Sequence, residues 1–597
     1  MATRHAVEFV IQSVDREAES ALIEQVDIDR VVGHVDALAD LRRHPGTDDE
    51  RQAAEYVVDQ LRAYGVDVEA GEYEGYVSEP TDAGLTVTRP TNWAVPDEEI
   101  ITVAFGGATP PVGVHGEVVS VPEVTPETLA SLDLDGRIAF TRGLPTPEPV
   151  EALAAAGASA AVFESPTPGH CHEMIVTPVW GTPGVEDASR VPDLPVVEVQ
   201  QSAGERLRDQ LTRGPVAATV QTSVTTDLYE LPCPVGRIEG RESDRYVVVG
   251  NHVDSWHEGV TDNATAVAVT LELARVFSAR DTQPRRGLVF GFWTAHSFGR
   301  YAGSTWFADT NFTDLRENGI AYLHLDLNGL RGADTLWYQH MAAVAEEHRD
   351  VLAAVPDLER PADSEATNES EQSSFLGDER PGRNSDQSFW GAGLVSLLSG
   401  ARLTPGTDDG GPVGGGWWWH TPADTRDKVD PDVLSEETKL YVALLARLCE
   451  SPVVPVDHAA SAAAVAEAVD ALGFDHPALD DLRERATALE ETVAEATRIA
   501  DARAAEPAVA SAAEDLTVEL NNRLVPALYE RGPNHRHDPA VEQRRLPGIA
   551  AVGDPDERTG RARLFAETSL RREVARVAEL LRESRAAAER FCDAYDE

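Results

Sequence analysis

The stretch YVVVGNHVDSWHEGVTDNATAV, residues 246–267, decides how this chain is interpreted. Its β-branched run predicts a buried strand that ends near His252 and Asp254. A loop then leads to Asp262 at the start of an amphipathic helix. Zinc accepts imidazole nitrogen and carboxylate oxygen, and a further carboxylate commonly orients a ligating histidine. We therefore interpret His252 and Asp262 as metal ligands and Asp254 as the orienting group; ordinary polar residues at a strand end are the alternative.

Strands and helices alternate on both sides of this stretch. After residue 235 the predicted strands GRIEG, YVVVGNHVD, GLVFGFWTAH and IAYLHLDLNG are separated by helices. This alternation predicts an α/β fold with a doubly wound, mainly parallel sheet. Helix-rich sequence without strands follows Pro455. We divide the chain into an N-terminal part of the metal-site domain, an inserted α/β unit, the metal-site domain itself and a helical domain: 1–114, 115–225, 226–454 and 455–597.

Further imidazole and carboxylate groups follow other predicted strands. His296 and Ser297 come after GLVFGFW, Asp326 follows YLHL, and His420 lies in a glycine-rich loop after three tryptophans. Open α/β sheets bind ligands at the carboxyl ends of their strands. Each of these residues alone is more often a satisfied polar group than a ligand. Several such groups in one chain favour a shared site.

Six ordered motifs resemble those of the di-zinc exopeptidases, which include bacterial leucyl aminopeptidases, glutamate carboxypeptidase and the transferrin receptor. They are GNHVDSW, TDNATAVAVTLELAR, FWTAHSFGRYAGSTWF, YLHLDLNG, NSDQSFWGAGLVSLLSG and HTPADTRDKVD, and the resemblance covers most of the chain. It implies that His252, Asp262, Asp326 and His420 bind one or two zinc ions, with Asp262 as the bridge. It also implies that the insert is a protease-associated domain and that the C-terminal helices form a homodimer.

The chain departs from this family where two adjacent glutamates, the general base and a ligand, usually occur. Here those positions are His296 and Ser297. A serine hydroxyl is a poor zinc ligand, whereas an imidazole with a pKa near ~6.5 can act as base or ligand.

Three hypotheses follow from this departure. His296 takes over as base or ligand, or nearby groups compensate, or the chain is a catalytically inactive, receptor-like binding protein. The compensating candidates lie in the loop before Asp262 and in the insert: His257, Glu258, His170, His172 and Glu173. Retention of the other ligands favours a hydrolase of a peptide or other amide bond that uses an altered general base.

Two further residues are candidates for contact with substrate. Trp419 could form a wall of the substrate pocket, or it could pack against the core. Arg383 could pair with a substrate carboxylate, or it could form a structural ion pair.

The composition limits the possible partners and surroundings. There are 103 acidic residues against 51 basic ones, a formal net charge of -52, and only two of the basic residues are lysine. The excess is spread along the chain, which argues against binding nucleic acid or anionic membranes and suits a halophilic protein. The four cysteines show no C-x-x-C spacing. Without an apolar signal core or an apolar run of ~18 residues, we expect a cytoplasmic protein outside the membrane.

Overall fold

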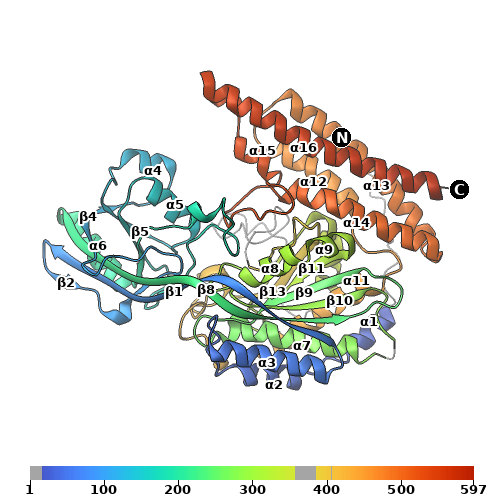
Figure 1. The fold of residues 1–597 in the computed structure, drawn as a ribbon, viewed down its shortest axis with the longest axis horizontal. Helices are drawn as coiled ribbons and strands as arrows, with labels where there is room; N and C mark the ends of the chain where they lie inside the picture. Colours follow the sequence, from blue (N-terminus) through green and yellow to red (C-terminus); the bar gives the residue numbers. More distant parts are fainter. Residues whose placement is uncertain (1–15, 281, 356–384, 405, 597) are drawn as a thin grey trace.

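One sheet of 13 strands runs through two of the three parts of the molecule (Figure 1). The computed structural model describes residues 16–280, 282–355, 385–404 and 406–596. The strand order is β12-β13-β11-β9-β10-β8-β4-β5-β6-β7-β3, and β1 pairs with β8 and with β2. The predicted α/β fold with a mainly parallel central sheet and a C-terminal helical region is therefore confirmed.

The central part of the sheet carries helices on both faces. Its parallel strands are β9 (Tyr246–His252), β10 (Gly287–Trp293), β11 (Gly319–His324) and β13 (Val395–Arg402), and β12 (Thr335–His340) is antiparallel at the edge. One face is covered by α1 (Arg16–Ile23), α2 (Ile28–Leu38), α3 (Asp48–Ala63), α7 (Thr265–Ser278) and α11 (Pro431–Glu450). Helix α10 (Ala345–Ala354) packs against α11. The other carries α8 (Ala302–Thr310) and α9 (Phe312–Asn318).

Strand β9 lies in the middle of this sheet, and all seven of its residues are buried. Strands covered on both faces need an apolar run, which the three valines supply. At Gly250 a β-carbon would lie 2.5 Å from Trp293 Nε1 and 2.7 Å from Tyr322 Oη, so only glycine allows these side chains to close over the strand. The end of β9, and with it His252, is therefore held firmly on both sides.

Strands β1 (Asp67–Arg89) and β8 (Val216–Ile238) form a long antiparallel ribbon that joins the insert to the central sheet. The last residues of β8 pair with β10 and its first residues pair with β4, so residue 225 lies within a strand shared by both parts. The outer part of the sheet consists of β4 (Val114–Ser120), β5 (Ile138–Arg142), β6 (Ala160–Glu164) and β7 (Val196–Val199), together with β2 (Trp93–Ala94) and β3 (Ile100–Thr102). Strands β2 and β3 precede residue 115, so this part of the sheet begins earlier in the chain than the predicted insert. Its helices are α4 (Pro126–Ser131), α5 (Pro147–Ala155) and α6 (Gln201–Arg213).

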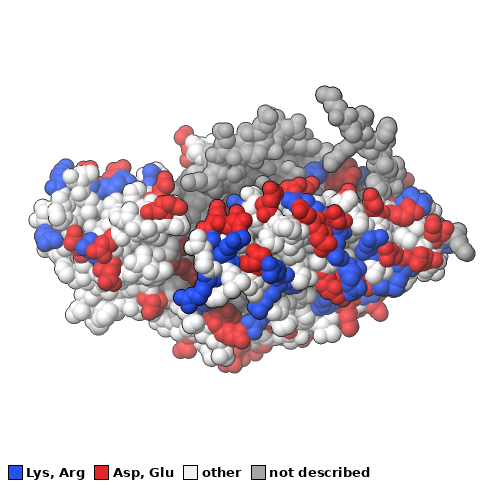
Figure 2. All heavy atoms as spheres, turned by 90° about the horizontal axis from the view of Figure 1, so that it is seen from above, with Lys and Arg blue, Asp and Glu red and all other residues white. Residues whose placement is uncertain are grey.

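The C-terminal part consists of helices α12 (His458–Asp470), α13 (Pro477–Ala502), α14 (Pro507–Tyr529), α15 (Pro547–Val552) and α16 (Gly560–Tyr595). In Figure 2, which views the molecule from the side of α16, acidic and basic side chains are interleaved along these helices. Several form ion pairs, such as Arg582 with Glu579 and Arg485 with Asp481. Of the described helices, none is both long and apolar enough to span a membrane.

Candidate metal centre

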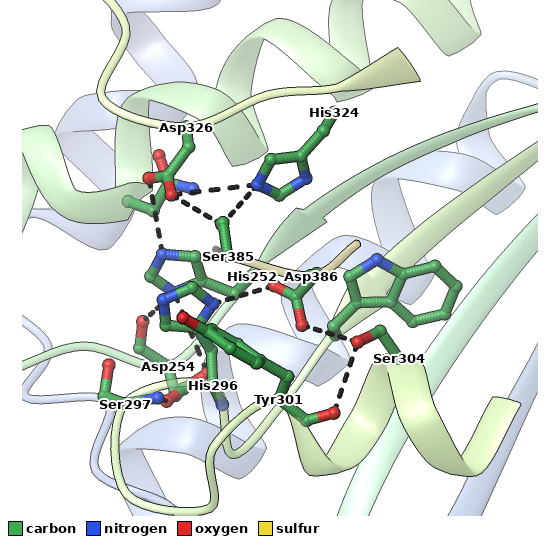
Figure 3. Close-up of polar contacts among 12 residues, drawn as sticks. His252, Asp254, His296, Ser297, Tyr301, Ser304, His324, Asp326, Ser385 and Asp386 are labelled. Carbon is green, nitrogen blue, oxygen red and sulfur yellow. Dashed lines mark hydrogen bonds and ion pairs between the residues drawn. The ribbon is translucent and has the colours of Figure 1, made fainter. Parts of the chain in front are cut away.

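A cluster of imidazole and carboxylate groups lies where β9, β10 and β11 end (Figure 3). His252 is the last residue of β9, His296 lies in the turn after β10, and Asp326 follows β11. Because these strands are parallel, their carboxyl ends meet at one edge of the sheet.

The carboxylate of Asp262 lies between two imidazoles. Its Oδ1 is 3.1 Å from Nε2 of His252, and its Oδ2 is 3.1 Å from Nε2 of His420. Asp326 Oδ1 lies 3.6 Å from the same His252 nitrogen. Donors bound to one tetrahedral zinc at about 2.0–2.2 Å are separated by roughly 3.3–3.6 Å, so these spacings are close to those of a shared cation.

The hydrogen bond that Nδ1 makes in His252 and in His420 fixes which ring nitrogen carries the proton. Nδ1 of His252 is 2.9 Å from the carbonyl of Asp254, and Nδ1 of His420 is 2.6 Å from the carbonyl of Glu173. A carbonyl oxygen only accepts hydrogen bonds, so both Nδ1 atoms carry the proton. In the neutral rings, each Nε2 then directs a lone pair at a carboxylate, an arrangement that is stable only with a cation between them.

Burial and charge around His252 support this conclusion. Nε2 of His252 and Oδ1 of Asp326 are buried and make no hydrogen bond. Burial alone would lower the pKa of His252, but the carboxylates of Asp262 and Asp326 hold that pKa well above its usual range. The pocket therefore selects positive charge, which a proton or a divalent metal ion can supply. The donor set, imidazole nitrogen with carboxylate oxygen, suits zinc.

His296 joins this cluster as a third imidazole. Its ring lies parallel to that of His252, with 3.7 Å between centroids and 12° between planes. Ligating atoms of His252, His296 and Asp326 lie within 4.8 Å of one another. Nδ1 of His296 is 2.8 Å from Oδ2 of Asp386, whose Oδ1 accepts a hydrogen bond of 2.7 Å from Ser304.

The charge state of Asp386 determines which ring nitrogen of His296 carries the proton. Burial would raise the pKa of Asp386, but the adjacent His296 lowers it below its usual value. The ionised carboxylate accepts the Nδ1 proton of His296 and leaves Nε2 available. Asp386 lies in the motif NSDQSFWGAGLVSLLSG, and nothing in the sequence indicates which histidine this carboxylate meets.

Asp254 holds parts of the cluster through both its backbone carbonyl and its side-chain carboxylate. Its backbone carbonyl accepts from His252, while its carboxylate oxygen lies 3.8 Å from the same ring. That carboxylate instead accepts the backbone N–H groups of His296 at 3.0 Å and of Ser297 at 2.8 Å. Asp254 therefore holds the turn after β10 as well as the ring of His252.

Two further residues hold the carboxylates in place. Ser385 donates a hydrogen bond of 2.7 Å to Asp326, and Asp424 accepts from the backbone N–H groups of Thr261 and Asp262. Burial raises the pKa of Asp424 to about 7. Neither residue was singled out from the sequence, because each acts on a ligand distant in the chain.

The residues considered as compensating groups have other partners. His170 stacks on Trp417 with 4.7 Å between ring centroids, and Glu258 pairs with Arg42. Nδ1 of His172 donates to the carbonyl of Trp419 at 2.6 Å. Glu173 lies 3.3 Å from Nε2 of His257. Arg383 lies outside the described residues, and Trp419 stacks on His420.

Backbone strain is concentrated around the centre. Five non-glycine residues beside it have positive φ angles of 52–56°: His257, Ala295, Leu327, Ser385 and His420. Such conformations cost energy and persist where surrounding contacts hold them, often at functional sites. His420 belongs to the cluster, and Ala295, Leu327 and Ser385 each adjoin a member in sequence. His257 lies in the loop between His252 and Asp262.

Comparison with known proteins agrees with this geometry. Residues 235–445 match the model for peptidase family M28. The probable lipoprotein aminopeptidase LpqL of Mycobacterium tuberculosis is 27% identical over 323 residues, 51% of this chain and 60% of that protein. The probable glutamate carboxypeptidase VP8 of Zea mays is 26% identical over 339 residues, 47% of each. The chain thus spans less than two thirds of the length of these relatives.

A solved structure shares the fold. BSAP, a zinc aminopeptidase from Bacillus subtilis, superposes with a TM-score of 0.52 at 20% identity, covering 72% of this chain and 97% of that one. At this identity the likeness concerns the fold. Residues 235–445 thus match peptidase family M28 in sequence, and the chain shares its fold with a zinc aminopeptidase.

Proposed function

We propose that this chain is a zinc-dependent hydrolase of the di-zinc exopeptidase type that cleaves a peptide or other amide bond. The observation that carries the proposal is the position of Asp262, whose two oxygens each lie 3.1 Å from Nε2 of a different histidine. The match to peptidase family M28 supports the same conclusion.

We infer two cation positions that differ in their number of donors. In the first, His252, Asp326 and one oxygen of Asp262 would hold the ion. In the second, His420 and the other oxygen of Asp262 would hold it, and Ser297 stands where the family resemblance expects a carboxylate. Zinc bound there supplies Lewis acidity at the amide carbonyl.

We propose that His296 is the altered general base. With Nδ1–H held by Asp386, its Nε2 can take a proton from the water that attacks the amide carbon. The same nitrogen can then deliver that proton to the leaving amine. Asp254, by accepting the backbone N–H groups at 296 and 297, keeps this imidazole facing the cluster.

The test combines metal analysis with turnover. Protein purified at high salt should contain zinc and hydrolyse members of a panel of aminoacyl amides and short peptides, and a chelator should abolish this turnover. His296→Ala should lower kcat by about 10²–10⁴-fold with the metal retained, the usual contribution of a general base. Bound metal with no turnover on any amide, or no metal at all, would instead support the inactive binding protein that the loss of the Glu–Glu pair favours.

We also propose a homodimer formed through the C-terminal helices. Leu564 and Phe565 at the start of α16 are 60% and 65% exposed, which is unusual for large apolar side chains. Sedimentation at high salt should give twice the mass of the chain, and Phe565→Glu should give the monomer. A wild-type monomer at micromolar concentration would contradict this proposal.

A further inference from the structure

The segment 170–173 of the insert packs side by side with the loop that carries His420. His170 stacks on Trp417, and His172 donates to the carbonyl of Trp419. The two segments thus meet residue by residue, although they are 247 positions apart in the chain.

His172 is fully buried, and both of its ring nitrogens are engaged. Nδ1 must carry the proton, because the carbonyl of Trp419 only accepts. Nε2 therefore accepts from the hydroxyl of Thr167 at 2.7 Å. This pair of bonds leaves the imidazole one orientation, so His172 fixes the distance between the insert and the backbone just before His420.

Glu173 continues the same contact on His420 itself. Its N–H donates to the carbonyl of His420 at 3.0 Å, and its own carbonyl accepts the Nδ1 proton of that ring at 2.6 Å. Its carboxylate lies 3.3 Å from His257, in the loop between His252 and Asp262. The insert therefore determines both the tautomer of His420 and the direction of its Nε2.

The two halves of the centre differ in what supports them. His252 ends a buried strand in the middle of the sheet, and its Nδ1 is held by Asp254 two residues away. His420 lies outside the helices and strands, at a strained φ of +54°, and its Nδ1 is held by the insert. Displacing the insert segment would thus move His420 and leave His252 in place.

We propose that the insert controls the second cation position: His172 and the backbone of Glu173 act as positioning groups for His420. This inference rests on the proposed function, since it needs the two positions defined by Asp262. A change at His172 should weaken the second ion and spare the first.

The test is a zinc titration of the metal-free full chain by calorimetry, with metal content measured after dialysis. His172→Phe keeps a ring and removes both hydrogen bonds. We expect the first ion to bind as in the wild type and the second to bind about 10–100-fold more weakly, the usual effect of losing a group that orients a metal ligand. His115→Gln, at an exposed histidine of the same insert, is the matched control and should bind both ions normally.

Two results would overturn the inference: unchanged affinities for both ions in His172→Phe, or equal weakening of both ions in a variant with native circular dichroism. If His172→Phe does not fold, Thr167→Val removes only the hydroxyl that holds Nε2 and should weaken the second ion in the same direction; no change there would also overturn it. Wild-type protein that binds no zinc would refute the proposed function instead.

Discussion

The substitution Asp386→Asn tests the proton arrangement at His296 directly. The buried carboxylate of Asp386 accepts from Nδ1 of His296 at 2.8 Å and from the hydroxyl of Ser304 at 2.7 Å. Asparagine has nearly the same shape, so packing is preserved. The hydroxyl of Ser304 can still donate to the amide oxygen, which turns the amide nitrogen, a donor only, toward His296.

The consequence for His296 is a change of tautomer. Facing an N–H donor, Nδ1 becomes the acceptor and the proton moves to Nε2, which can then no longer accept a proton from water. We expect kcat to fall by about 10²–10⁴-fold, equivalent to about 3–5 kcal/mol of transition-state stabilisation. KM and zinc content should change little, because none of the atoms that face the cation is altered.

The assay compares kcat, KM and zinc content in the wild type, Asp386→Asn and Ser304→Ala. Loss of the Ser304 hydroxyl leaves the carboxylate ionised, so this control should keep most of the activity. Nitrogen-15 chemical shifts of the His296 ring would report the tautomer independently of turnover. Wild-type kcat in Asp386→Asn, with the tautomer shown to have changed, would refute the assignment of His296 as the base.

Three further outcomes can be checked. Asp262→Asn should remove zinc from both positions, so elemental analysis that still finds a full complement would contradict a bridging role. Burial between Tyr56 and Tyr64 lowers the pKa of His34 to about 4, so the neutral ring contributes stability above pH 6.5 that is lost as the pH falls toward 4. Relative to His34→Gln, the wild type should lose about 2 kcal/mol of unfolding free energy between pH 8 and pH 5, measured by urea titration; a constant difference would refute this. Because the net charge is -52, raising salt from about 0.1 M to about 1 M should raise the thermal midpoint by screening repulsion, and a steady fall would contradict adaptation to high salt.

The sequence alone was sufficient to predict the fold class and the strands that carry the centre. Short apolar runs coincide with β9, β10 and β11, because a strand covered on both faces has few other possible compositions. One element differs in extent: the segment GRIEG contributes only the end of the 23-residue β8. Pairing with β1 extends the strand, a contact between residues far apart in the chain.

Residue types, spacing and resemblance also pointed to His252, Asp262, Asp326 and His420 as metal ligands. In the tertiary structure His252 and His420 face the two oxygens of the Asp262 carboxylate, and Asp326 faces His252. Only the tertiary structure decided which proton each ring carries, since that depends on the backbone carbonyl of Asp254 or Glu173 that faces it. It alone paired His296 with Asp386 and joined the insert to His420. The physical reason is that hydrogen-bond partners distant in sequence leave no periodic signal, whereas burial of a strand or helix face does.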